Sequence, residues 1–108
     1  MSSHVFDTHA WANLDEFNQM GNIGSEVGRA LSAKRQNKPE RMQAAFYRGL
    51  DLIDETAQLW AHDKKPGLKE LLYARELFAE AVSGNKDNPW LEKYFMEFAV
   101  AARTRQFK

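Results

Sequence analysis

The chain has 108 residues, of which 44% are hydrophobic and 28% are charged, so it is long enough for one modest core and too apolar for a disordered protein. It has no cysteine, which excludes disulfides and thiolate metal sites and favours a cytoplasmic location. Its 15 basic and 15 acidic residues cancel, whereas a dedicated nucleic-acid binder is usually more basic. We therefore expect a single domain over residues 1–108.

The sequence gives no sign of a membrane or export segment. No apolar run approaches the length of a membrane span. The opening residues, "MSSHVFDTHAW", lack the basic-then-apolar order of a signal peptide. We expect a cytoplasmic protein with no membrane contact.

The first predicted element is a helix over residues 8–36 that contains three glycines. At about 100° per residue, these glycines share one side of the helix with Phe17 and Leu31. Because neither a GxGxxG spacing nor a following Lys-Ser/Thr is present, a ligand loop is disfavoured. We interpret them as a helix-packing channel, with a kink near Gly24, capped by Ser25, as the alternative. The packing residues are Gly21, Gly24 and Gly28.

Three further helices are predicted over residues 39–61, 66–83 and 89–106. Pro39, Pro66 and Pro89 suit first helical turns, and Asn88 suits an N-cap. No segment alternates apolar and polar residues as a strand does. Short connections favour antiparallel neighbours, so the pattern predicts an all-α, antiparallel up-down four-helix bundle.

The chemistry-bearing residues do not form a recognisable catalytic set. His4, Asp7 and His9 are close in sequence, but no fourth metal ligand is evident, and capping of the first helix by Asp7 or Thr8 is the simpler interpretation. The Glu-x-x-His pairs of di-metal bundles do not occur. We expect no catalytic residue, no metal and no cofactor, hence no enzyme.

Basic residues are concentrated around the predicted first turn. Between residues 29 and 48 the only acid is Glu40. Basic side chains near helix ends are common because they interact favourably with the helix dipole. Such a cluster also suits contacts to the phosphates of RNA or DNA that position the nucleic acid without reading its bases. The candidate nucleic-acid-binding residues are Arg29, Lys34, Arg35, Lys38, Arg41 and Arg48.

Aromatic residues make up 12% of the chain, more than a small core requires. We expect some of them to be half exposed at an interface with another chain, because aromatic side chains dominate such interfaces. A homo-oligomer or a complex with a different protein would satisfy this expectation. The candidate interface residues are Trp11, Trp60, Trp90 and Phe107.

Four runs carry a resemblance to known proteins: "WANLDEFNQMGNIGSEVGRAL", "AAFYRGLDLID", "KELLYARELF" and "LEKYFMEFAVAAR". The chain resembles uncharacterised small bacterial four-helix-bundle proteins. More distantly it resembles the accessory variability determinants of diversity-generating retroelements, the intervening-sequence proteins of ribosomal RNA, and HEPN domains. The first two of these groups form ring-shaped homopentamers. The Arg-to-His spacing of HEPN ribonucleases is absent, which leaves only a catalytically silent HEPN-like domain.

The resemblance implies a self-associating accessory or scaffold protein. Its partner would be a nucleic-acid enzyme such as a retroelement reverse transcriptase, with RNA or DNA touching the basic end. The alternative is a small-molecule or nucleotide sensor that uses the glycine-lined channel of the first helix.

Overall fold

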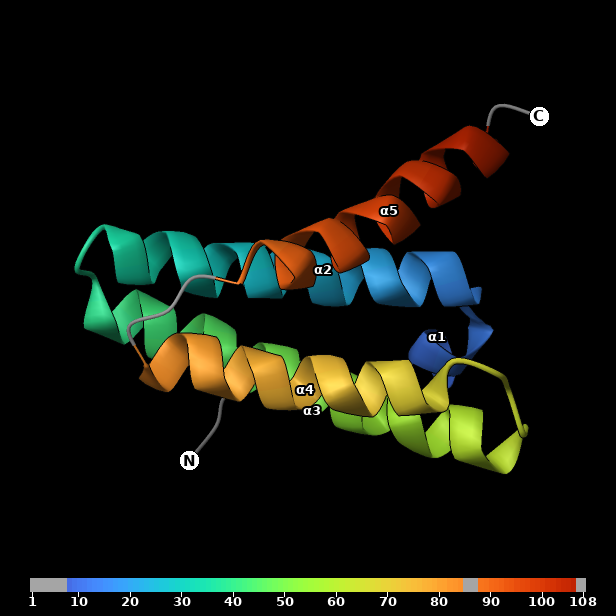
Figure 1. Ribbon diagram of the computed structural model, residues 1–108. Coiled ribbons are helices and arrows are strands. Elements are labelled where there is room, and N and C mark those ends of the chain that lie inside the picture. The colour runs from blue at the N-terminus through green and yellow to red at the C-terminus, as the bar shows by residue number, and fades with distance from the viewer. Residues whose placement is uncertain (1–7, 85–87, 107–108) are drawn as a thin grey trace.

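The computed structural model describes residues 8–84 and 88–106, and every regular element in these ranges is an α-helix, as predicted. Figure 1 shows that the four longer helices reverse direction from one to the next, and that the last one diverges from the others. The helices are α1 (Thr8–Asn13), α2 (Glu16–Arg35), α3 (Pro39–His62), α4 (Leu68–Ser83) and α5 (Pro89–Gln106).

The expectation of one continuous helix over residues 8–36 is wrong, because the chain breaks at Leu14 and Asp15. Asp15 has extended backbone angles, and its carboxylate accepts a hydrogen bond from the backbone N–H of Asn18 at 2.8 Å. This side chain satisfies one of the free N–H groups at the start of α2, so α2 begins there as a separate helix. The described chain therefore has five helices instead of four.

The other boundaries follow their sequence signals more closely. Pro39 opens α3, and Asn88 caps α5 by accepting a hydrogen bond from the N–H of Leu91 at 3.2 Å. Pro66 does not open α4, which begins at Leu68. Gly67 precedes it with φ +96°, a left-handed conformation that favours glycine, so the connection turns once more before the helix starts.

The core forms around α2, which packs most extensively against α3 and α5, while α4 packs mainly on α3. The side chain of Arg75 in α4 makes two hydrogen bonds to the carboxylate of Asp54 in α3, at 2.7 and 3.3 Å. Direct contact between α4 and α5 is slight. The largest fully buried side chains are Met20, Val27, Ile23, Ile53, Thr56, Leu71, Phe78, Leu91 and Phe95.

The glycines of α2 differ in their surroundings, and the helix is continuous through all three. A Cβ added to Gly24 would lie 2.8 Å from the Cβ of Phe95, so this glycine permits the close approach of α5. A Cβ added to Gly28 would meet nothing within 4 Å, so the prediction that Gly28 permits close helix packing is wrong. The alternative of a kink near Gly24 with Ser25 as a cap is wrong, since the helix is continuous there and the Ser25 hydroxyl donates to the carbonyl of Gly21 within it.

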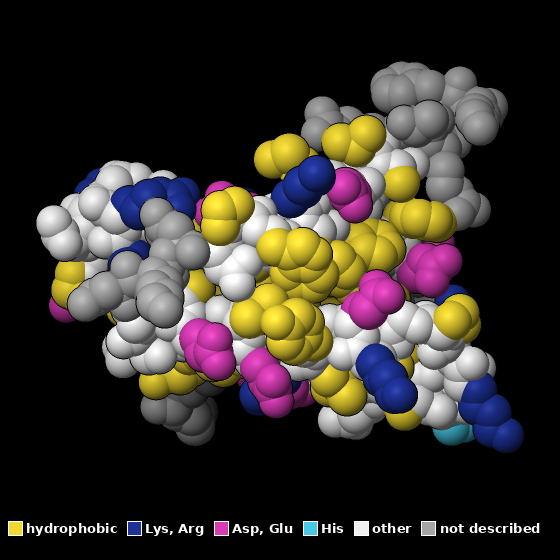
Figure 2. Space-filling view, viewed as in Figure 1, with side chains coloured by type: hydrophobic (Ala, Val, Ile, Leu, Met, Phe, Trp, Pro, Cys, Tyr) yellow, Lys and Arg dark blue, Asp and Glu magenta, His cyan; other side chains and the backbone are white. Residues whose placement is uncertain are grey.

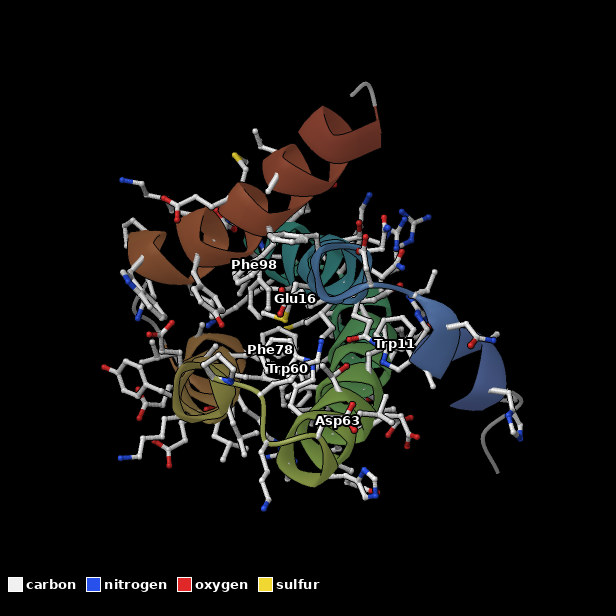
Figure 3. All side chains as sticks on the ribbon, turned by 90° about the vertical axis from the view of Figure 1, so that its right-hand side faces the viewer. Trp11, Glu16, Trp60, Asp63, Phe78 and Phe98 are labelled. Carbon is white, nitrogen blue, oxygen red and sulfur yellow. The ribbon has the colours of Figure 1, made fainter. Side chains whose placement is uncertain are left out.

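α1 is held against α2 and α3 by a buried set of hydrogen bonds. The indole N–H of Trp11 donates to the Thr56 hydroxyl at 2.8 Å, and the Gln19 amide donates to the backbone carbonyl of Trp11 at 2.9 Å. The indole N–H of Trp60 donates to Gln19 at 3.3 Å. Figure 3 shows Trp11 directed toward α3 and Trp60 enclosed between helices.

The expectation that Trp11 and Trp60 are half-exposed interface residues is therefore wrong. Both side chains are buried in the core. Burial removes their large apolar rings from water. Thr56 and Gln19 accept hydrogen bonds from the two indole N–H groups, as a buried tryptophan requires.

Candidate nucleic-acid interface

A groove of about 700 Å³ runs between α2 and α3 and contains most of the predicted basic cluster. Its basic lining residues are Arg29 from α2, Lys38 from the turn, and Arg41 and Arg48 from α3. The remaining lining residues are small or polar: Ser25, Gly28, Ser32, Ala33, Gln36, Ala44 and Ala45.

The spacing of residues explains why these side chains meet. Positions 25, 29, 32 and 36 recur every three or four residues and so share one side of α2. Positions 38, 41, 45 and 48 do the same at the start of α3. Because glycine and alanine lie between the longer side chains, the surface is hollowed where the two helices meet.

Glu26 orients two of the arginines. One carboxylate oxygen accepts a hydrogen bond from Arg29 at 2.8 Å, and the other accepts one from Arg48 at 3.1 Å. The Glu26 side chain is only 13% exposed, so this carboxylate sits beneath the two guanidinium groups. The pairing fixes the arginine side chains in place and leaves their other N–H groups for a ligand.

Lys38 and Arg41 are exposed at the rim of the groove. Within the part of the chain that the structure describes, neither side chain has an ion pair with a carboxylate. Four basic groups and the one partly buried carboxylate of Glu26 therefore give the groove a surplus of positive charge, although the whole chain is neutral. Such a local field attracts anions at short range.

Lys34 and Arg35 do not line this groove, which corrects the expectation of a six-residue surface. The Lys34 ammonium donates to the backbone carbonyls of Ala81 and Gly84, where it caps the end of α4. Arg35 pairs with Glu92 of α5 at 3.3 Å. Both residues point away because they lie on the other sides of α2 from Arg29.

Three lining residues were not predicted from the sequence to belong to a binding site, although Ser25 was considered as a helix cap. Ser25, Ser32 and Gln36 place hydroxyl and amide donors beside the arginines. Their signal was available, since they share the helical register of Arg29.

Apart from Gly28, the described helix-packing and interface candidates lie outside this groove. Gly21, Gly24 and Gly28 line a hollow of about 370 Å³ between α2 and α5, into which Phe95 and Met96 also project. Trp90 is 43% exposed on α5, as an interface residue would be. Phe107 lies outside the described residues.

The metal candidates receive no geometric support. His4 and Asp7 lie outside the described residues, and His9 is exposed. Among the residues that the structure describes, no group of three or more His, Cys, Asp or Glu side chains is placed to hold a metal ion. Within the same residues, no helix combines the length and apolar character needed to cross a membrane.

Comparisons of this chain with protein-family models, with curated proteins and with solved structures found no match.

Proposed function

We propose that this protein is a non-enzymatic, self-associating accessory protein that binds the phosphate backbone of RNA through the groove between α2 and α3. The observation that carries this proposal is the convergence of Arg29, Lys38, Arg41 and Arg48 on one groove. The partner that the resemblance implies is a nucleic-acid enzyme such as a reverse transcriptase. The proposed self-associating unit is an up-down bundle of the four longer helices α2 to α5, with the short α1 packed against α2 and α3, and it acts in the cytoplasm.

The lining of the groove suits phosphates better than bases. Arginine N–H groups form paired hydrogen bonds with phosphate oxygens, and serine and glutamine side chains add neutral donors. Among the residues that the structure describes, no aromatic ring lines the groove to stack on a base. Binding should therefore depend weakly on sequence and strongly on salt.

A nucleotide sensor is the second candidate, favoured by the hollow between α2 and α5. Phe95 and Met96 offer apolar contacts there, and Arg35 offers a cation. However, Arg35 is paired with Glu92, so this hollow has less free positive charge than the larger groove. A nucleotide that raises the melting temperature, with Met96→Glu abolishing the effect, would favour this function, because Met96 lines this hollow and not the larger groove.

The test of RNA binding is fluorescence anisotropy with a labelled single-stranded RNA of about 12 nucleotides, a length in the range of known single-strand sites. We expect Lys38→Glu/Arg41→Glu to weaken binding at least ~10-fold and to lower the salt slope by about 1 per lost phosphate contact. The matched control is Lys64→Glu/Lys65→Glu, which changes the net charge equally in the exposed α3–α4 connection. Equal loss in both variants, or affinity that ignores salt, would contradict the proposal.

A further inference from the structure

An aromatic cluster lies where α4 and α5 face each other, with the rings of Tyr73 and Trp90 exposed above Tyr94, which is buried, and Phe98, which is partly buried. Trp90 stacks on Tyr94 with ring centroids 4.9 Å apart, and Tyr73 of α4 approaches Trp90 at 5.7 Å. Phe98 continues the cluster along α5 at 5.3 Å from Tyr94. We call Tyr73, Trp90, Tyr94 and Phe98 the aromatic face. Figure 2 shows a hydrophobic area over α4 and α5 with several acidic and a few basic side chains around it.

The aromatic face is open because of how the helices pair. α4 packs on α3, and α5 packs on α2, so little of α4 touches α5. Figure 1 shows the second half of α5 leaving the other helices. Tyr73 is 53% exposed and Trp90 is 43% exposed, yet their stacking contacts hold the rings in place. A fixed, exposed group of aromatic rings is typical of a protein-binding surface.

The sequence of α5 indicates that α2 alone does not complete its packing. Glu97 is the only charged residue between Tyr94 and Ala102. Phe95 is buried against Gly24 of α2, whereas Met96 is exposed on another side of the helix. A helix that is apolar on most sides is normally covered on more than one side.

The charges around the aromatic face are complementary to the end of the same helix. Glu70 and Glu80 of α4 and Glu97 of α5 are exposed on the helices that carry it, and they outnumber the exposed Lys69 and Lys93. The negative charge of Glu70 acts on Tyr94, which places this carboxylate beside the cluster. In the sequence, α5 ends with Arg103 and Arg105. The chain thus contains both an apolar surface with acidic edges and an apolar helix with a basic end.

We propose that the aromatic face binds a second copy of this chain, with the C-terminal half of each α5 lying across the aromatic face of the other copy. This inference rests on the self-association in the proposed function and names its surface. A two-fold axis makes the exchange reciprocal, so each copy supplies one helix and one face. The neutral net charge of the chain adds no overall repulsion between the copies.

The first test is the mass in solution, measured by analytical ultracentrifugation over a range of concentrations. We expect the native chain to dimerise and Trp90→Glu to weaken the dimer at least ~10-fold, because a charge would be buried among apolar groups. Tyr47→Glu is the matched control, since Tyr47 of α3 is a surface aromatic residue, 56% exposed, outside the aromatic face. Circular dichroism checks that both variants fold.

The second test identifies which part of the other copy is bound. Glu70→Lys/Glu80→Lys and Arg103→Glu/Arg105→Glu should each be monomeric, because each variant brings like charges together. Mixed in equal amounts, the two variants should form a heterodimer, since each basic surface then meets an acidic one. A monomeric native chain, or a mixture that stays monomeric, overturns the proposal.

Failure of this inference differs from failure of the proposed function. If the short RNA binds normally while the native chain remains monomeric, the inference is wrong and RNA binding stands. If the chain dimerises as described but no RNA binds, the inference stands and the function is wrong.

Discussion

Gly24 and Gly28 are four residues apart on α2 and have opposite surroundings. Replacing Gly24 with Leu forces a side chain into Phe95, and such overpacking should lower the free energy of unfolding by roughly 1–3 kcal/mol. Gly28→Ala adds a methyl group in open space and should raise it by about 1 kcal/mol through helix propensity. Urea unfolding measures both. A neutral Gly24→Leu would show that α2 and α5 are not in close contact there.

Tyr94 gives a pH dependence of stability. Burial, with a smaller contribution from the charge of Glu70, raises the pKa of Tyr94 to about 12. Its pKa in the unfolded chain is about 10, so the folded state favours the neutral phenol. The contribution of Tyr94 to stability should therefore be constant below pH ~10 and decline as the pH rises toward 12. Tyr94→Phe should decline less over this window in urea unfolding. An identical decline in both proteins would assign the loss to other groups.

The docking of α1 depends on one buried hydroxyl. Thr56→Val keeps the shape of the side chain but removes the acceptor for the Trp11 indole N–H. A buried donor that loses its acceptor costs about 1–3 kcal/mol. We expect that decrease in the free energy of unfolding, together with a change in tryptophan fluorescence, whereas Thr56→Ser should retain most of the stability. Native stability in the valine variant would mean that α1 adds little to the fold.

The elements show which features were predictable from sequence. The apolar periodicity and the positions of Pro39 and Asn88 predicted where α3, α4 and α5 begin to within two residues. The break at Leu14 and Asp15 was missed because Asp15 and Asn18 are also ordinary residues of an exposed helix surface. The burial of Trp11 and Trp60 depends on Gln19 and Thr56, which come from distant parts of the chain, so only the tertiary structure reveals it.

The whole molecule carries its two candidate surfaces on different helix pairs. The basic groove is formed by α2 and α3, and the aromatic face by α4 and α5. The sequence indicated the basic cluster. It could not show that Lys34 and Arg35 are bound to α4 and α5, because those contacts depend on where α4 ends and α5 begins. A dimer formed through the aromatic faces leaves both basic grooves uncovered.

Two open grooves in one dimer make a prediction about RNA length. An RNA of about 40 nucleotides can occupy both grooves, and the second contact is then intramolecular, which should tighten binding by at least ~10-fold over a 12-nucleotide RNA. Trp90→Glu should remove this length effect while leaving the affinity for the short RNA unchanged, because Trp90 lies outside the groove.

The control for this experiment is Lys64→Glu/Lys65→Glu. Tyr47→Glu is not suitable here, since it places a negative charge next to Arg48. Fluorescence anisotropy with both RNAs measures the effect. If Trp90→Glu retains the length effect, a single groove with additional contacts along the RNA would account for binding, and the two-groove dimer would be wrong.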